Sequence, residues 1–389
     1  MPFELPSDLI RPAGDGDAIA GVRPRWVATP PTTEQAAEVL RTAAAEGLAV
    51  VARGAGTKQD WALPPRRLDL VVDTSRLTGV VDHAAGDLVV VVRAGTPMSE
   101  LAGKLAAAGQ QLATDAPFPD ATVGGTVAVN ISGPRRMRYG TIRDLLIGIT
   151  VVRPDGVVAH SGGRVVKNVA GYDLGKLMTG SYGTLGLITE CAFRLHPIPT
   201  TETYLVRRGA DPAVIAAVLG SQVMPSALEI DIPAGGEPEL VVLLEGTPEG
   251  VAQRAASTAA LIGGEVAAGP PDWFGRYPWR DGEIGVKLTA ALSRVPALLS
   301  AAAEHGIPVR GCAGTGVLYA NLSPAADPAH VLARLREVAE YAVVLTAPPP
   351  VRDQLDVWGP VNGLDLMRRV KAQFDPDSRF APGRFVGGI

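Results

Sequence analysis

The feature that most constrains the fold of this chain is a glycine-rich, positively charged loop directly after an apolar run. Residues 50–61 read VVARGAGTKQDW. A helix is predicted upstream, because Thr32 and Gln35 have capping-box spacing and Gly47 can end it, and LAVVA then reads as a buried strand. Loops at the carboxyl ends of strands are where open α/β sheets bind ligands. Backbone N–H groups without a neighbouring Cβ can approach phosphate oxygens, so the loop predicts a phosphate site.

The best-known nucleotide motifs do not fit this loop. The dinucleotide pattern G-x-G-x-x-G fails, because Gly54 and Gly56 are followed by Gln59 at the third position. The P-loop pattern fails because Lys58 lacks glycine at the required spacing. Neither Rossmann-type NAD binding nor ATP hydrolysis is therefore indicated. Taken alone, the loop is equally well interpreted as a surface turn that contains two glycines.

Composition narrows the class of protein. With 389 residues the chain is long enough for two or three domains, and 36 basic against 40 acidic residues give a net charge of −4, which argues against nucleic-acid binding. Two cysteines, Cys191 and Cys312, are too few for a disulfide framework or an iron–sulfur cluster and are interpreted as small buried residues. The first residues, MPFELPSDLI, lack the features of a signal peptide, and no apolar run approaches the roughly 20 residues of a membrane span. The chain is predicted to be cytoplasmic and to reach the inner face of a membrane only through a partner.

Strand and helix patterns divide the chain into regions. Up to Pro199, β runs are joined by loops, among them a loop-rich stretch over 113–140 and a hairpin that turns at Asp155. From residue 201, the order strand, helix, strand, strand, helix occurs and then recurs, which is typical of ferredoxin-like units. We therefore expect an N-terminal segment over 1–26, a first domain over 27–200, a cap domain over 201–355 and a C-terminal segment over 356–389 that returns to the first domain.

Three further loops accompany the first. DATVGGTVAVN, over 120–130, places paired glycines where backbone could lie against a flat ring or a ribityl chain, and VVKNVAGYDLGKLMTGSYGTLGLITE, over 165–190, supplies glycines just before a strand. FAPGRF, over 380–385, stands near the end of the chain. Each loop alone is a weak signal, but their order and spacing together are specific.

In this order the loops resemble the FAD-binding domain of the vanillyl-alcohol oxidase / p-cresol methylhydroxylase (PCMH) family. The resemblance runs from about Val27 to Pro199 and again in the C-terminal tail. It implies an α+β fold, with a two-part FAD-binding domain of the p-cresol methylhydroxylase type over 27–200 and a ferredoxin-like α+β cap. It also implies that the phosphate held by the first loop is the pyrophosphate of FAD.

The resemblance assigns candidate cofactor-binding residues to these loops. Those that would donate to the pyrophosphate are Arg53, Gly54, Ala55, Gly56, Thr57 and Lys58. Those that would run beside the flavin and ribityl chain are Asp120, Thr122, Gly124, Gly125 and Asn130. Those that would touch the ring system or the adenine side are Gly183 and Ile188. Some relatives attach FAD through a histidine in or near the first loop, but RGAGTKQDW contains none, so FAD is expected to be noncovalent.

Within the family, the strongest resemblance is to FAD-binding subunits of bacterial glycolate oxidases. It is carried by VVKNVAGYDLGKLMTGSYGTLG, WGPVNGLDLMRRVKAQFDP and IAGVRPRWVATPPTTEQAAEVL, and it implies a complex with a second related flavin subunit and an iron–sulfur subunit. Catalytic flavin subunits and related D-2-hydroxy-acid dehydrogenases carry H-x-G-D-G-N-x-H-x-N, whose histidines help to hold a metal. Here CAGTGVLYAN, over 312–321, has Cys312 and Tyr319 in place of those histidines. No metal site and no catalytic residue is therefore assigned.

The resemblance thus implies an FAD-dependent oxidoreductase for a small 2-hydroxy acid, acting as the companion flavin subunit of a glycolate-oxidase-like complex. Two alternatives stay open. One is a non-catalytic structural or electron-transfer flavin subunit, and the other is a free-standing FAD-dependent oxidase of an alcohol or sugar.

Two segments outside the glycine loops carry charge. The aromatic loop WFGRYPWRDGE, over 273–283, is interpreted as a packing plug, although Arg276 or Arg280 could hold a carboxylate. RRMR, over 135–138, could face solvent, an acidic partner or a flavin phosphate. Lys167 could line the flavin, with no role assigned.

Overall fold

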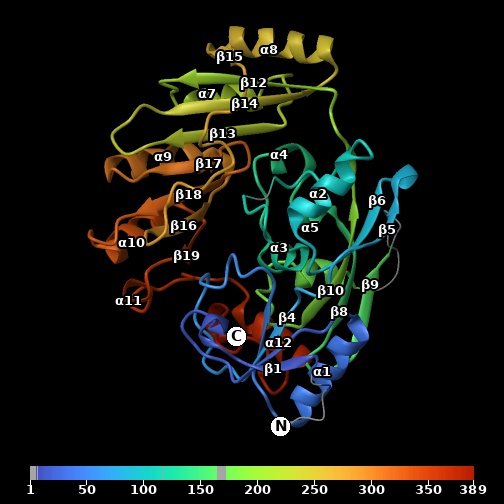
Figure 1. The fold of residues 1–389 in the computed structure, drawn as a ribbon. Coiled ribbons are helices and arrows are strands. Elements are labelled where there is room, and N and C mark those ends of the chain that lie inside the picture. Colours follow the sequence, from blue (N-terminus) through green and yellow to red (C-terminus); the bar gives the residue numbers. More distant parts are fainter. Residues whose placement is uncertain (1–5, 7, 116, 164–171) are drawn as a thin grey trace. The chain divides into compact units, whose positions relative to one another are not determined.

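The computed structural model describes residues 6, 8–115, 117–163 and 172–389. The chain forms two compact units, each with its own sheets (Figure 1). Unit 1 comprises Met1–Ile131, Thr141–Ile198 and Val361–Ile389, and unit 2 comprises Ser132–Gly140 and Pro199–Pro360. Lys167, which the sequence suggests as a flavin neighbour, lies outside the described residues.

A small mixed sheet in unit 1 carries the strand that precedes the glycine-rich loop. Its strand order is β1-β2-β4-β3, with β2, β4 and β3 parallel and β1 antiparallel to β2. The strands are β1 (Ile10–Pro12), β2 (Trp26–Ala28), β3 (Val50–Arg53) and β4 (Leu70–Asp73). Helix α1 (Thr33–Ala45) connects β2 to β3 and packs its apolar side chains on this sheet. The Thr32 hydroxyl accepts the Gln35 N–H at 3.2 Å, so the predicted N-cap is confirmed.

A larger antiparallel sheet in unit 1 has the strand order β5-β6-β10-β8-β9. Its strands are β5 (Val80–Ala84), β6 (Val89–Arg93), β8 (Leu146–Val152), β9 (Val158–Gly162) and β10 (Leu187–Arg194). Strands β8 and β9 form the hairpin predicted around Asp155. The other elements that unit 1 has up to residue 198 are η1 (Asp15–Asp17), η2 (Ala85–Asp87), α2 (Met98–Ala106), β7 (Gln110–Gln111), α3 (Val123–Val129), α5 (Ile142–Leu145), α6 (Leu174–Met178) and β11 (His196–Pro197). Helices α2 and α3 share one apolar core with β6, β8 and β10.

The C-terminal segment completes unit 1 beside β3. It contains α12 (Leu364–Phe374) and η4 (Val386–Gly388). Val50 donates its N–H to the Arg379 carbonyl at 2.8 Å and accepts the Ala381 N–H at 2.7 Å, so the tail extends the small sheet at its β3 edge. Between these bonds, Phe380 is fully buried, and burial of such a side chain stabilises the folded state by about 2 kcal/mol.

A buried ion pair anchors this tail. Lys371 Nζ lies 2.6 Å from Asp375 Oδ2 and also donates to the carbonyls of Thr184 at 2.7 Å and Phe380 at 2.8 Å. Asp375 Oδ2 in turn accepts the Phe380 N–H at 2.7 Å. The three donors of the ammonium group are thus all used inside the protein. Because loss of one partner would leave the other charge buried and uncompensated, the pair holds the tail to the rest of unit 1.

Residues 199–360, all of them described, form two copies of a β-α-β-β-α-β pattern in unit 2. The first copy is β12 (Thr201–Arg208), α7 (Ala213–Leu219), β13 (Ala227–Ile232), β14 (Glu239–Gly246), α8 (Pro248–Ile262) and β15 (Glu265–Ala267). The second is β16 (Ile284–Thr289), α9 (Val295–Glu304), β17 (Val309–Cys312), β18 (Val317–Leu322), α10 (Pro328–Val338) and β19 (Tyr341–Thr346), with the short helices η3 (Leu292–Arg294) and α11 (Pro349–Arg352). Pairing of β13 with β17 joins the copies into an eight-stranded sheet, β15-β12-β14-β13-β17-β18-β16-β19. The predicted α+β fold class with a ferredoxin-like cap is confirmed.

The two faces of this sheet are covered differently. Helices α7, α8, α9 and α10 pack on one face, over buried apolar side chains such as Leu228, Leu240 and Leu318 (Figure 1). The other face carries α4 (Arg136–Tyr139) and the aromatic loop before β16, and we call it the α4 face. Side chains alternate along a strand, so the polar residues Glu229, Lys287 and Tyr319 lie on the α4 face.

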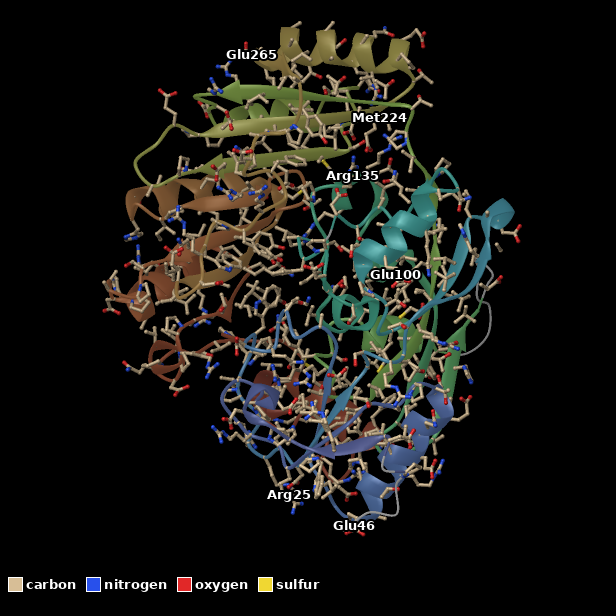
Figure 2. The ribbon with its side chains drawn as sticks, viewed as in Figure 1. Arg25, Glu46, Glu100, Arg135, Met224 and Glu265 are labelled. Carbon is tan, nitrogen blue, oxygen red and sulfur yellow. The ribbon has the colours of Figure 1, made fainter. Side chains whose placement is uncertain are left out.

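Ser132–Gly140, which the sequence assigns to the first domain, packs with unit 2 instead. Arg135, labelled in Figure 2, donates to Glu245 at 2.6 Å and to Glu202 at 2.7 Å, and the Tyr139 hydroxyl donates to Glu245 at 2.9 Å. These carboxylates stand on β14 and β12, more than sixty residues further along the chain. Their position opposite the RRMR run is a consequence of the sheet register, which the local sequence does not reveal.

Candidate cofactor site

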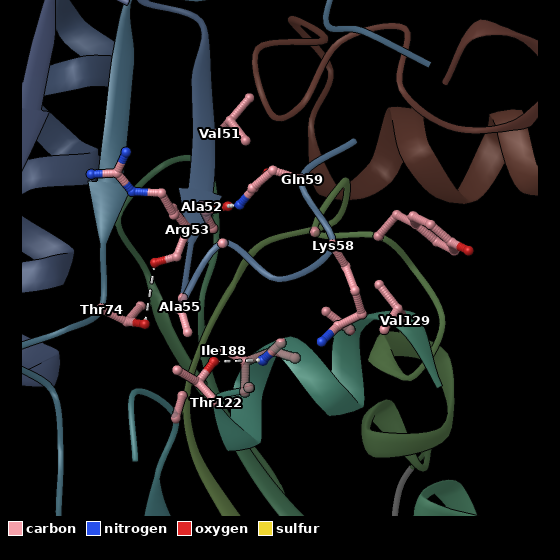
Figure 3. Close-up of a pocket in the computed structure, with 18 of the residues that line it drawn as sticks. Val51, Ala52, Arg53, Ala55, Lys58, Gln59, Thr74, Thr122, Val129 and Ile188 are labelled. Atoms are coloured by element: carbon pink, nitrogen blue, oxygen red, sulfur yellow. Dashed lines mark hydrogen bonds between the residues drawn. The ribbon is translucent and has the colours of Figure 1, made fainter. Parts of the chain in front are cut away.

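The glycine-rich loop after β3 lines a cavity in unit 1 (Figure 3). Its other walls come from α3 and from the segment that leads into β10. The residues suggested by the sequence that line it are Arg53, Gly54, Ala55, Gly56, Thr57, Lys58, Thr122, Gly124, Gly125, Gly183 and Ile188. Segments separated by more than a hundred residues thus meet around one space.

Two glycines explain how the loop approaches α3. A Cβ on Gly54 would lie 2.2 Å from the Thr122 hydroxyl oxygen, so no side chain fits there. That hydroxyl caps α3 by accepting the Gly125 N–H at 3.2 Å. Gly56 has a φ of +77°, which favours glycine, and no protein atom lies within 4 Å of the place its Cβ would take. Its backbone therefore faces the cavity.

The Arg53 side chain turns to carboxylates and not to the cavity, contrary to the expectation that it donates to the pyrophosphate. Arg53 Nη2 donates to Asp73 Oδ2 and Asp17 Oδ1, both at 2.9 Å, and Nε donates to Asp73 at 3.0 Å. Hydrogen bonds from Arg11, Gly14 and Arg53 hold the pKa of Asp17 well below its usual range. Asp17 and Asp73 are largely buried and require a cation, so the Arg53 guanidinium is already occupied by these two carboxylates.

Lys58 is the basic side chain of the loop that stays available. Its Nζ donates to the Thr57 hydroxyl at 2.7 Å and lies 4.9 Å from the Phe118 ring centroid, and no carboxylate pairs with it in the part of the chain that the structure describes. Figure 3 shows it reaching toward α3. Burial lowers the pKa of Lys58 to about 8. An anion in the cavity would favour the charged form and raise this pKa again.

Two of the suggested residues stand outside the lining. Asp120 is exposed just before α3. Asn130 ends α3 in the left-handed conformation, with a φ of 54°, and its Oδ1 is buried without a hydrogen-bond partner among the described residues. Neither side chain belongs to the cavity wall formed by the described residues.

The structure adds wall residues that the motifs did not single out. Thr74, Ala94, Val129 and Tyr182 line the cavity, and so does Arg384 from the C-terminal FAPGRF segment. Arg384 Nη2 donates to the carbonyls of Gln59 at 2.8 Å and Trp61 at 2.9 Å. The C-terminal tail therefore holds the glycine-rich loop in place through Arg384. The arginine within FAPGRF was the sequence signal that could have indicated this contact.

The CAGTGVLYAN segment lies in unit 2 and does not have the residues of a metal centre. It forms the end of β17, a turn and most of β18. Cys312 is buried, and burial raises the pKa of its thiol to about 12. No group of three or more His, Cys, Asp or Glu side chains converges as metal ligands would, within the described ranges. Cys312, Thr315, Val317 and Tyr319 of this segment are not the nitrogen and carboxylate ligands that a metal-assisted site requires.

The aromatic loop before β16 packs on the α4 face, as the plug interpretation expects. The rings of Tyr277 and Trp279 stack with centroids 4.4 Å apart, and Trp279 lies over Gly285 of β16, where a Cβ would come within 2.5 Å of the indole. Arg276 and Arg280, the candidate carboxylate ligands of this loop, are exposed. The structure instead brings Arg136 and Lys287 together on this face, and the sequence did not single out Lys287.

Comparisons with known proteins relate this chain to FAD-binding proteins. Residues 24–162 match the FAD binding domain family. Glycolate oxidase subunit GlcE of Escherichia coli (strain K12) is 34% identical over 238 residues, covering 60% of this chain and 65% of that protein. Mitochondrial D-lactate dehydrogenase (cytochrome) 1 of Saccharomyces cerevisiae is 36% identical over 187 residues, covering 47% of this chain and 32% of that protein. The chain thus spans less than two thirds of the length of these curated relatives.

A solved structure of alkyldihydroxyacetonephosphate synthase superposes with a TM-score of 0.68 at 16% identity. The superposition covers 97% of this chain and 83% of that one, which shows a shared fold.

No helix among the described residues is long and apolar enough to cross a membrane. The family match coincides with the strand, loop and helix that build the cavity. Residues 24–162 therefore form an FAD-binding domain, and FAD is the cofactor of this chain.

Proposed function

We propose that this chain is the FAD-binding subunit of a glycolate-oxidase-like complex that oxidises a small 2-hydroxy acid to a 2-oxo acid. The observation that carries the proposal is the cavity behind the β3 loop, most of whose wall lies in the region that matches the FAD binding domain family. The 34% identity with a glycolate oxidase subunit supports the choice of substrate class.

The cavity fits the pyrophosphate and the flavin for physical reasons. Gly54 to Thr57 present backbone N–H groups with little side chain in the way, and Lys58 adds a cation without a carboxylate partner in the described chain. Gly124 and Gly125 would flank the flavin and ribityl chain, and Ile188 would touch the ring system or the adenine side. The chemistry that FAD supplies when bound is acceptance of a hydride from C2 of the acid. No histidine is among the wall residues in the described chain, in keeping with noncovalent FAD.

We further propose that the chain is the companion flavin subunit, paired with a second related flavin subunit and an iron–sulfur subunit. The support is chemical, since Cys312, Thr315, Val317 and Tyr319 cannot supply the nitrogen and carboxylate ligands of a metal-assisted site. The same observation favours a second candidate, a flavin subunit that conducts electrons or stabilises the complex without turning over substrate. Any contact with a membrane would then be peripheral and made through partners.

Flavin reduction tests the proposal. The purified chain should be yellow and should release FAD on acid precipitation. Mixed anaerobically with glycolate or D-lactate, the isolated protein should keep an oxidised flavin, and it should bind no stoichiometric zinc or manganese. Bleaching that requires the second flavin subunit supports the companion role. Rapid metal-dependent bleaching of the isolated chain would show that it is itself the dehydrogenase, and bleaching only with alcohols or sugars would indicate a free-standing oxidase.

A further inference from the structure

Two cationic side chains meet a tyrosine on the α4 face of unit 2. Lys287 on β16 stands directly opposite Tyr319 on β18. Arg136 on α4 donates from Nη2 to the Tyr319 hydroxyl at 3.2 Å and from Nε to the Gly133 carbonyl at 3.0 Å. All three side chains are partly buried. The cluster is therefore built from three elements that only the sheet register and the α4 contact bring together.

Neither cation has a carboxylate within ion-pair distance in the part of the chain that the structure describes. Among the described residues, Arg136 and Lys287 form no ion pair, and Lys287 Nζ makes no hydrogen bond. The basic neighbours on the same face are paired: Arg135 lies 2.6 Å from Glu245, and Arg310 lies 2.8 Å from Asp231. Charges withdrawn from water are ordinarily paired, so two partly buried cations without a partner indicate a place for an anion.

The surrounding charges do not balance these two cations. Glu229 on β13 is the carboxylate that acts on Arg136 and Tyr319, and it also takes part in a hydrogen bond with the Cys312 thiol. Arg310 on β17 stands opposite Tyr319, but Asp231 neutralises it. Counted over the described residues, one carboxylate beside two cations leaves an excess of positive charge.

Tyr319 responds to this excess positive charge. Burial alone would raise the pKa of Tyr319, but the neighbouring Arg136 and Lys287 outweigh burial and lower it. The pKa of Lys287 is itself lowered, chiefly by burial. Burial thus disfavours the charged form of Lys287, whereas the two cations favour the charged form of Tyr319 against burial.

An aromatic wall bounds the cluster. The Tyr319 ring meets Tyr277 edge-on with centroids 4.7 Å apart and Trp279 with centroids 6.0 Å apart. Tyr277 and Trp279 are held against each other by stacking, and Gly285 lets the indole lie directly on β16. Such a wall keeps water away from the cations and so strengthens their attraction for an anion.

We propose that Arg136, Lys287 and Tyr319 form a binding site for a small carboxylate anion in which no metal takes part. A guanidinium presents parallel N–H donors that match a carboxylate, and Arg136 Nη1 has no partner among the described residues. Lys287 supplies the second charge, and the Tyr319 hydroxyl, which accepts from Arg136, can donate its proton to the carboxylate. The site goes beyond the proposed function, since it belongs to unit 2 and requires neither FAD nor a partner subunit.

Calorimetric titration of the full-length, FAD-loaded chain with oxalate tests the site, because oxalate is a carboxylate with no C2 hydrogen to lose. We expect binding that weakens at least about tenfold in Lys287→Met, while uncharged glycolamide does not bind. Arg276→Met is the matched control, because it removes an exposed arginine of the aromatic loop, and it should leave the affinity unchanged. No oxalate binding, or binding that Lys287→Met does not weaken, would overturn the proposal, provided that circular dichroism shows both variants folded.

A spectroscopic titration gives a second readout that does not depend on affinity. The tyrosinate absorbance of the wild-type chain minus that of Tyr319→Phe reports Tyr319 alone, and Tyr172→Phe provides the control, since Tyr172 is 93% exposed. We expect Tyr319 to ionise below the usual pH range of tyrosine, and saturating oxalate to move this ionisation to higher pH, because the bound anion offsets Arg136 and Lys287. Ionisation of Tyr319 at or above the usual range of tyrosine, or one that oxalate does not move, would contradict the proposal. Both experiments proceed without electron transfer, so they stand apart from the test of flavin reduction.

Discussion

The cofactor cavity of unit 1 and the α4-face cluster of unit 2 are both suited to anions, but they are built from different parts of the chain. Glycines and other small residues dominate the cavity loop, which offers backbone N–H groups and the single ammonium group of Lys58. The α4 face offers the side chains of Arg136, Lys287 and Tyr319 from three separate elements. A backbone site requires a contiguous glycine-rich segment, whereas a side-chain site requires only that distant residues meet. The first therefore leaves a local sequence pattern and the second does not.

The two sites also differ in what holds them in place. The cavity loop depends on the C-terminal tail, because Arg384 donates to two carbonyls of the loop and Lys371 anchors the tail. The α4-face cluster depends on the pairing of β16, β17 and β18. Perturbation of the tail should therefore damage the cavity and spare the α4 face.

Replacement of the tail anchor should have the largest effect. Lys371→Met leaves Asp375 buried without its cation, so the free energy of unfolding should fall by about 3–5 kcal/mol. Urea denaturation followed by flavin release measures this. Lys104→Met removes an exposed pair with Glu100 and should change the free energy of unfolding by less than about 0.5 kcal/mol. Oxalate binding by unit 2 should persist in Lys371→Met at low urea, and its loss together with FAD would mean that the two sites are not independent.

Obstruction of the cavity loop comes next. Gly56→Val would place a side chain where the pyrophosphate is expected, and loss of one or two charge-assisted backbone contacts should weaken FAD binding by about 10- to 100-fold with the fold intact. Gly47→Val is the matched control for backbone strain. Gly47 also has a positive φ, of 62°, and open space around it, but it lies outside the cavity wall. Equal FAD occupancy in the two variants would mean that the loop is only a turn.

Removal of the available cation should have a smaller, pH-dependent effect. In FAD-free protein Lys58 loses its proton near pH 8, and a bound pyrophosphate favours the protonated form. Binding therefore takes up a proton above that pH, so FAD affinity should be constant below about pH 8 and fall as the pH rises further. Fluorescence titration of the apoprotein measures this. Lys58→Met should weaken binding by about tenfold near pH 7 and abolish the pH dependence. A similar pH dependence in the variant would exclude Lys58 as its source.

Arg53→Gln should affect FAD binding least, although Arg53 stands within the same motif. Its guanidinium is occupied by Asp17 and Asp73, so the substitution should lower the free energy of unfolding while changing FAD affinity by less than about threefold. Fluorescence titration and urea denaturation of the same variant separate the two effects. A loss of affinity as large as that in Lys58→Met would show that the Arg53 side chain reaches the cofactor.

Prediction from sequence succeeded where the signal is local. The Thr32 cap, the β8–β9 hairpin and the repeated strand and helix order of unit 2 each follow from spacing within one segment. Prediction from sequence was incomplete where the partner of a side chain lies far away in the chain. Arg53 turned to Asp73 of the neighbouring strand, and the 132–140 segment joined unit 2 through Glu202 and Glu245. Such choices depend on which carboxylates the fold brings within reach.

The sequence by itself determined the FAD-binding domain and the two ferredoxin-like repeats, because glycine placement, capping and hydrophobic period are properties of consecutive residues. Only the tertiary structure decided which cations remain unpaired. Lys58 and Arg53 stand five residues apart in one motif, yet one is left available and the other is neutralised. No sequence motif singled out Lys287, and only strand pairing shows that it lies opposite Tyr319. The physical reason is that electrostatic pairing depends on distance and burial, and both are set by contacts between segments far apart in the chain.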